Sequence, residues 1–99
     1  MGNKVDENLN IYEVDGVITS LPILIDSDAK QFEILMTRAV QRPSQVFIQH
    51  QIIRFDHDYY KDVVALLGKA VNFITDRVYD ESTGFSYLNL MEYEELAVA

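Results

Sequence analysis

The chain has 99 residues with 16 acidic and 8 basic side chains, and its formal net charge is −8 at pH 7. This length suffices for one hydrophobic core, so we expect residues 1–99 to form a single small domain, with a polar tail over 1–8 and an acidic tail over 94–99. The chain contains no cysteine, which excludes disulfides, thiolate metal sites and a cysteine nucleophile.

The acidic residues are concentrated in the two ends of the chain. Residues 1–28 carry six acids against Lys4, residues 80–99 carry five acids and no base, and residues 29–79 have a small positive excess. Contact with a phosphate backbone requires concentrated Lys and Arg, so we expect no direct binding to nucleic acid. The same reasoning argues against an anionic membrane surface. The acidic surface is explained most simply as a means of keeping a small protein soluble, and the sharper interpretation is complementarity to a basic protein partner.

Hydropathy predicts the location of the chain. No run approaches the ~20 apolar residues that cross a bilayer, and the first ten residues lack the apolar segment of a signal peptide. We therefore expect a cytoplasmic protein, located in the host cytoplasm if the chain is viral.

The first predicted element is a β-hairpin. Asp15-Gly16 can supply the two residues of positive φ that a tight turn needs, and β-branched or aromatic residues flank it. We predict strands over 9–14 and 17–25. Pro22 must lie at an edge, a bulge or a break because it has no N–H to donate. The apolar run 21–25 predicts that both faces of its strand are covered.

Residues 28–41 fit two structures. As a helix, Asp28 would cap the first turn and the apolar residues would form one stripe before Pro43. As a strand, apolar and polar residues alternate between two faces. The many helix-forming residues favour the helix. The strand would instead give a meander of four antiparallel strands.

The next two segments predict a strand followed by a long helix. Residues 45–55 are rich in β-branched and aromatic side chains, which favour a strand. Over 57–79 the apolar residues recur at the i, i+3, i+4, i+7 spacing of one helix face, and Asp56 and Asp58 are suitable N-terminal caps. At ~1.5 Å per residue this helix would be roughly 30 Å long. Its stripe consists of Tyr60, Val63, Val64, Leu67, Ala70, Val71, Ile74 and Val78.

A turn and a last strand complete the predicted fold. Residues 80–84 have turn composition, with Gly84 free to take a positive φ, and apolar residues alternate over 85–93. The fold class we predict is α+β. A mostly antiparallel sheet of four strands (9–14, 17–25, 45–55 and 85–93) packs against the long amphipathic helix 57–79, with 28–41 as a second helix.

One dense polar cluster, Asp56-His57-Asp58, is a candidate catalytic or metal site. An imidazole between two carboxylates can bind a divalent metal or act as a base. A metal needs three or four converging ligands, however, and neighbours in sequence point in different directions. Acidic caps at a helix start with an exposed histidine explain the cluster more simply. We therefore predict no metal, no cofactor, no catalytic residue and no enzymatic activity, with a metal-dependent hydrolase as the outside alternative.

A five-residue run bears a family resemblance. Tyr79-Asp80-Glu81-Ser82-Thr83 resembles a short run in the phage uracil-DNA glycosylase inhibitors, a family of small acidic α/β proteins that mimic DNA. The resemblance covers five of 99 residues, and no site residue follows from it.

These observations predict a small acidic protein-binding domain. It would be an inhibitor, immunity protein or nucleic-acid mimic of viral or mobile-element origin that acts on a basic partner. The alternative is a structural, self-associating module that forms a homodimer through a strand edge or an apolar face. Tyrosine combines apolar area with a polar tip, and acids complement a basic surface. The predicted partner-binding residues are Tyr12, Glu13, Asp15, Tyr87, Glu92, Tyr93, Glu94 and Glu95.

Overall fold

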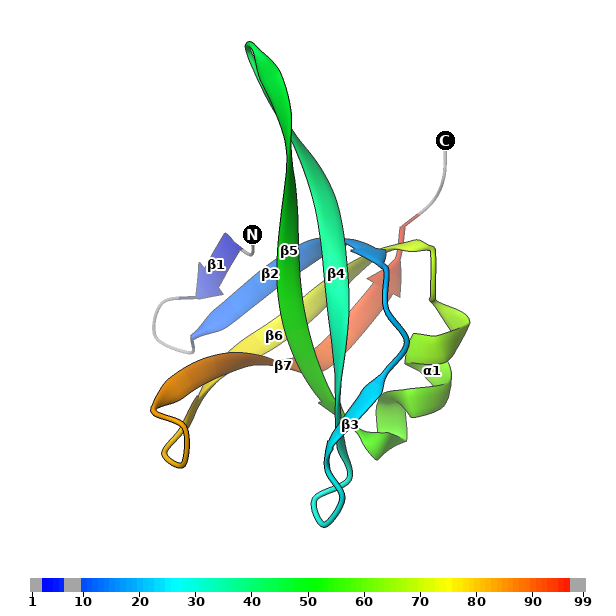
Figure 1. Cartoon of the computed structure of the whole chain (residues 1–99), viewed down its shortest axis with the longest axis vertical. Helices are drawn as coiled ribbons and strands as arrows, with labels where there is room; N and C mark the ends of the chain where they lie inside the picture. Colours follow the sequence, from blue (N-terminus) through cyan, green and yellow to red (C-terminus); the bar gives the residue numbers. More distant parts are fainter. Residues whose placement is uncertain (1–2, 7–9, 97–99) are drawn as a thin grey trace.

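A computed structural model describes residues 3–6 and 10–96 of the chain. These residues form seven strands and one short helical segment (Figure 1). The strands are β1 (Asn3–Asp6), β2 (Ile11–Ile18), β3 (Ile23–Asp26), β4 (Gln31–Arg42), β5 (Gln45–Asp56), β6 (Ala70–Asp80) and β7 (Phe85–Glu95). The 3₁₀ turn η1 (His57–Tyr59) leads directly into helix α1 (Tyr60–Ala65).

Five of the strands close into a barrel. The strand order is β1-β2-β6-β7-β5-β4-β3, and β2 also pairs with β4, which completes the ring β2-β6-β7-β5-β4. Within this ring β5 and β7 are parallel and the other neighbours are antiparallel. Strands β1 and β3 lie outside the ring, against β2 and β4.

Strand β2 belongs to both sides of the barrel, and Gly16 makes this possible. The strand pairs with β6 from Ile11 to Val17, and its last two residues pair with β4. A Cβ atom at Gly16 would lie 2.8 Å from the carbonyl oxygen of Thr37. The two backbones approach so closely that a side chain does not fit between them.

The predicted hairpin turn at Asp15-Gly16 is therefore wrong. The glycine serves a close backbone approach within one continuous strand, and its φ is not positive. The predicted strand 17–25 is divided between the end of β2 and the short β3. The expectation that the run 21–25 is covered on both faces is also wrong, because Leu21, Ile23 and Leu24 are each more than half exposed.

Alternate residues of the barrel strands fill its interior. Val63 and Leu66, from α1 and the residue that follows it, add to this core. Thr75 is fully buried as well, and its hydroxyl donates a hydrogen bond to the carbonyl oxygen of Tyr12 at 3.0 Å. The remaining core residues are Val14, Ile18, Ile34, Met36, Ile53, Phe55, Val71, Phe73, Leu88 and Leu90.

The predicted helix over 57–79 is wrong beyond its first turns. Helical backbone ends at Ala65, and Gly68 takes a φ of +79° and donates its N–H to the carbonyl oxygen of Ile18. From Ala70 onward the chain is strand β6. The molecule is mostly β, and the predicted α+β class with a sheet on a long helix is wrong as well.

The sequence of β6 explains this error. Val71, Phe73 and Thr75 are fully buried and alternate with less buried neighbours, as in a strand with one face on the core. The apolar residues of this segment fit a period of two as well as a helical period. Its β-branched and aromatic side chains pack well on a pleated surface, and pairing with β2 and β7 decides for the strand.

Residues 28–41 show the same preference for strands. The strand alternative is right and the predicted second helix is wrong, because β4 pairs with β5 along its whole length, from Gln31 opposite Asp56 to Arg42 opposite Gln45. Beyond the barrel the two strands continue as a twisted hairpin that projects from the molecule (Figure 1). These long-range pairs override a helix propensity that is only a weak preference.

Other predicted elements agree with the structure. The strands over 45–55 and 85–93 are confirmed as β5 and β7, and Gly84 takes the expected positive φ, +76°. Of the predicted tails, residues 3–6 form β1 and β7 extends to Glu95, whereas 1–2, 7–8 and 97–99 lie outside the described residues. Among the described residues no helix is long and apolar enough to cross a membrane.

Candidate functional site

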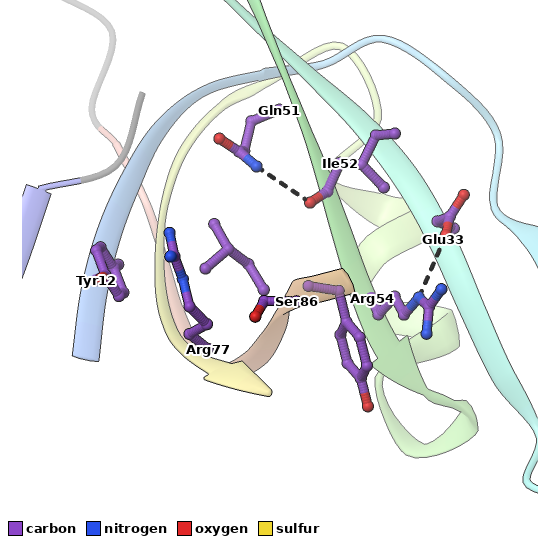
Figure 2. A pocket seen from close by; sticks show the side chains of 9 residues that line it. Tyr12, Glu33, Gln51, Ile52, Arg54, Arg77 and Ser86 are labelled. Carbon is purple, nitrogen blue, oxygen red and sulfur yellow. Dashed lines mark hydrogen bonds and ion pairs between the residues drawn. The ribbon is translucent and has the colours of Figure 1, made fainter. Parts of the chain in front are cut away.

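An open groove of about 410 Å³ lies between β5 and the side of the barrel formed by β2, β6 and β7 (Figure 2). All five barrel strands contribute side chains to it. The groove is lined by Tyr12, Glu33, Gln51, Ile52, Arg54, Arg77, Ser86, Tyr87 and Leu88.

Arg54 occupies one side of the groove. It points out of the barrel because its neighbours Ile53 and Phe55 are completely buried. Its guanidinium carbon lies 4.1 Å from the ring centroid of Tyr87, within the range of a cation–π contact. Its Nε lies 3.3 Å from Oε2 of Glu33, the residue opposite it on β4.

A second carboxylate also faces Arg54. Oδ2 of Asp80 lies 3.7 Å from its Nη1. The other oxygen, Oδ1, accepts hydrogen bonds from the hydroxyl and the N–H of Ser82. These two hydrogen bonds, together with the charge of Arg54, hold the pKa of the Asp80 carboxyl below its ordinary value near 3.8. The positive charge of Arg54 is thus balanced within the protein.

Arg77 and Tyr12 form a similar pair on the other side of the groove. The guanidinium carbon of Arg77 lies 5.0 Å from the ring centroid of Tyr12. Tyr12 is half-buried and packs against the core, whereas Arg77 is exposed. Within the described part of the chain, Arg77 has no carboxylate partner. Its charge is therefore available to an anion.

The two pairs flank one hollow with polar groups on its walls. In Figure 2 Arg77 and Tyr12 lie on one side and Arg54 on the other, with Ser86 between them. The side-chain nitrogen of Gln51 donates to the carbonyl oxygen of Ile52 at 3.4 Å. Tyrosine rings and guanidinium planes offer flat surfaces for a nucleic-acid base, and Gln51 and Ser86 offer hydrogen-bonding groups beside them.

Of the predicted partner-binding residues, the structure brings together Tyr12 and Tyr87, both in this groove. The two acids of β2 are engaged elsewhere. Glu13 accepts a hydrogen bond from the side-chain amide of Asn72 at 3.3 Å, and Asp15 forms an ion pair with Arg38 at 2.9 Å.

The other four predicted residues lie near the end of β7. The ring of Tyr93 meets Phe73 edge-on, and desolvation together with the Asp62 carboxylate raises the pKa of its phenol. Glu95 pairs with Lys69 at 3.3 Å. Glu92 and Glu94 are exposed on the same strand. The part of these residues in binding a partner stays a prediction.

Sequence reasoning missed the two groove arginines. The strand predicted over 45–55 carried a usable signal, because alternation with apolar neighbours places Arg54 on the outer face. Arg77 lies within the segment predicted as a helix, so strand alternation could not be used to place its side chain on the outer face. Nothing local connects either arginine with its tyrosine, since the contacts join strands distant in sequence.

The cluster Asp56-His57-Asp58 is a cap. Oδ1 of Asp56 accepts the N–H of Asp58 at 2.9 Å and begins the 3₁₀ turn, which confirms the predicted capping by Asp56. The absence of a metal at this cluster stays a prediction. One ligand atom from each residue lies within 4.8 Å of the others, but all three side chains are exposed. His50 on β5 is a cross-strand residue, with its Nδ1 3.2 Å from the hydroxyl of Thr37 on β4.

Comparisons with known proteins rest on structure alone. No protein-family model matches the chain, and a search of curated proteins also finds no match. A small single-stranded DNA-binding protein from Mycoplasma pneumoniae is similar, with a TM-score of 0.63 and 11% identity over 88% of this chain and 93% of that one. A mitochondrial single-stranded DNA-binding protein from S. cerevisiae is also similar, with a TM-score of 0.53 and 14% identity over 89% of this chain and 95% of that one.

These similarities correct the predicted function and partner. The acidic inhibitor of a basic protein and the exclusion of nucleic acid are both wrong, because the similar structures are named for binding single-stranded DNA. The prediction failed because net charge does not reveal how arginines and aromatic rings are placed locally. The predicted viral origin is also withdrawn, since neither structure is viral. The homodimer through a strand edge or an apolar face stays a prediction.

The similarity shows the architecture of the chain. The names of both proteins state a binding activity. The expectation that this chain is not an enzyme stays a prediction. The ring joins its strands in the order β2-β4-β5-β7-β6, so the last two are exchanged relative to their order in the chain, and a five-stranded Greek-key barrel of this kind is the OB architecture. The chain thus has the fold of these two single-stranded DNA-binding proteins.

Proposed function

We propose that the chain binds single-stranded DNA in the groove between β5 and the β2-β6-β7 side of the barrel. The observation that carries this proposal is the presence of two arginine–tyrosine pairs, Arg54 with Tyr87 and Arg77 with Tyr12, on opposite sides of one groove. The bases stack on these flat groups, and the exposed guanidinium of Arg77 contacts a phosphate.

The position of the groove supports the proposal. OB barrels bind oligonucleotides on the face of their second and third strands, beside the loops after the first and fourth strands. In this barrel those strands are β4 and β5, and the loops are residues 19–30 and 81–84. Glu33 and Arg54, which line the groove, lie on this outer face.

The energetics favour recognition of bases over phosphates. Stacking on an aromatic side chain contributes about 1–3 kcal/mol per base. Each phosphate contact on a single strand contributes a salt-dependence slope of about −0.7. Because Arg77 is the groove arginine without a carboxylate partner among the described residues, we expect few phosphate contacts and a shallow slope. A duplex binds weakly, since its bases are stacked on one another.

Fluorescence anisotropy tests the proposal. An end-labelled oligothymidylate of about 16 nucleotides covers the site of one OB barrel. The expected result is saturable binding of the single strand, a slope of log K against log salt between zero and about −2, and much weaker binding of a duplex of equal length. The oligonucleotide is recovered uncleaved, as expected for a binding protein. Equal affinity for the duplex, or no binding, contradicts the proposal.

A further inference from the structure

The two groove arginines differ in the charges that surround them. Arg54 faces Glu33 on β4 and Asp80 at the end of β6, whereas Arg77 forms no ion pair with the described side chains of residues 10–96. The Arg54 side chain is 22% exposed, and those of its two acidic partners are 28% and 24% exposed. This ion-pair network therefore lies partly out of water, where screening by salt is reduced.

Three contacts leave Arg54 with little freedom. One face of its guanidinium lies over the ring of Tyr87. Its Nε and Nη1 are directed at the carboxylates of Glu33 and Asp80, at 3.3 Å and 3.7 Å. Neither ion pair involves Nη2, and the side chain keeps 22% of its surface exposed for a ligand. A base that stacks on this exposed part would leave both ion pairs in place.

The turn after β6 holds Asp80 in place. Its Oδ1 accepts two hydrogen bonds from Ser82, at 2.9 Å and 2.6 Å, so that Oδ2 is left to face Arg54. The backbone carbonyl oxygen of Asp80 accepts the N–H of Gly84 at 2.9 Å, which closes the turn. Glu33 is held in turn by the register of β4 against β5.

We propose that Glu33 and Asp80 determine the specificity of the groove by keeping phosphates away from Arg54. The inference rests on the proposed binding of single-stranded DNA. A phosphate that approaches the guanidinium meets two carboxylates already paired with it and is repelled by both. A base carries no charge and is accepted. The groove thereby selects unpaired bases over polyanions that offer phosphate alone.

The test is a charge-only substitution with a matched control. Asp80→Asn keeps an Oδ1 acceptor for the two hydrogen bonds from Ser82 and removes the charge that faces Arg54. Glu33→Gln is the second variant and tests the same proposal if Asp80→Asn fails to fold. Glu81→Gln changes the net charge by the same amount in the same turn, and Glu81 forms no ion pair with any of the described residues.

Two readouts are used with the labelled oligothymidylate. In the first, inorganic polyphosphate competes for the groove. We expect it to compete about two- to fivefold better against Asp80→Asn or Glu33→Gln than against the wild type, the range for loss of one partly exposed ion pair. In the second, the salt-dependence slope becomes steeper by about 0.7, because one further phosphate is neutralised. Glu81→Gln leaves both readouts at the wild-type value.

The inference is overturned if Asp80→Asn and Glu33→Gln behave like Glu81→Gln in both readouts. It is also overturned if all three variants improve competition equally, since net charge alone would then explain the gain. Failure of the proposed function looks different. In that case the wild-type protein itself does not bind oligothymidylate.

Discussion

The arginine–tyrosine pairs on the two sides of the groove combine the same residue types in different electrostatic settings. Arg54 lies over Tyr87 with carboxylates at two of its nitrogens, whereas Arg77 lies over Tyr12 and is exposed. The first pair is a fixed stacking surface whose single cation faces two carboxylates, and the second is a stacking surface with an available positive charge. In a chain of net charge −8, the immediate neighbours of a cation therefore decide its role.

Removal of a stacking ring has the largest expected effect. Tyr87→Ala or Tyr12→Ala should weaken oligothymidylate binding by about 1–3 kcal/mol, or roughly 5- to 150-fold, because a base loses its aromatic surface. Tyr87→Phe is the control that keeps the ring and loses only the hydroxyl. Anisotropy titrations measure the change. A Tyr87→Phe variant as weak as Tyr87→Ala would show that stacking is not the source of affinity.

Both arginine–tyrosine pairs lie on a closed barrel, and each keeps its place only if the barrel stays closed. Gly16→Ala should lower the free energy of unfolding by about 1–3 kcal/mol, because the added Cβ would lie 2.8 Å from the carbonyl oxygen of Thr37. Urea denaturation followed by circular dichroism measures the loss. Affinity per folded molecule should change little. Unchanged stability would mean that β2 and β4 can separate without cost.

Neutralising each arginine separates the two roles. Arg77→Gln should weaken binding about two- to fivefold and make the salt-dependence slope shallower by about 0.7, since one phosphate contact is lost. Arg54→Gln should weaken stacking and leave the slope unchanged.

Lys69→Gln is the charge-matched control for both substitutions. Lys69 precedes β6, pairs with Glu95 and lies at the opposite end of that strand from Arg77. Its neutralisation should leave affinity and slope close to those of the wild type. Equal slope changes for Arg54→Gln and Arg77→Gln would contradict the distinction between the two pairs.

Lowering the pH should affect the side of the groove that holds Arg54 and Tyr87 and leave the side that holds Arg77 and Tyr12 unchanged. The pKa of Asp80 is lowered in the folded protein, so its charged form adds stability above the unfolded value near 3.8, and this contribution is lost as the pH falls through the lower folded value. Carbon-13 NMR of the Asp80 carboxyl should show the depressed pKa, with loosening of the 80–84 turn in the same pH range. A pKa at or above 3.8 would contradict the geometry of the turn.

Part of this fold could be predicted from the sequence. Local signals located β5, β7 and the turn at Gly84, because strand composition and turn residues act over a few positions. Two decisive features are not local. Residues 70–78 satisfy helical and strand periods together, and Gly16 serves a contact with Thr37 that no neighbouring residue reveals.

The candidate site could be predicted only in part. Tyr12 and Tyr87 were selected because tyrosine is common at interfaces, and the structure places both in the groove. The arginines were missed because net charge was interpreted for the chain as a whole. The role of each arginine depends on its cross-strand neighbours, such as Glu33 opposite Arg54. For Arg77 these neighbours could not be inferred, because the segment that forms β6 was predicted as a helix. The location in the cytoplasm stays a prediction.

An NMR titration of the labelled protein with oligothymidylate tests the central claim most directly. The account predicts that the largest shifts fall on the backbone amides of Tyr12, Arg54, Arg77 and Tyr87 and on the Nε–H signals of the two arginines. Shifts confined to the tip of the β4–β5 hairpin or to α1, or no shifts at saturating oligonucleotide, would contradict it.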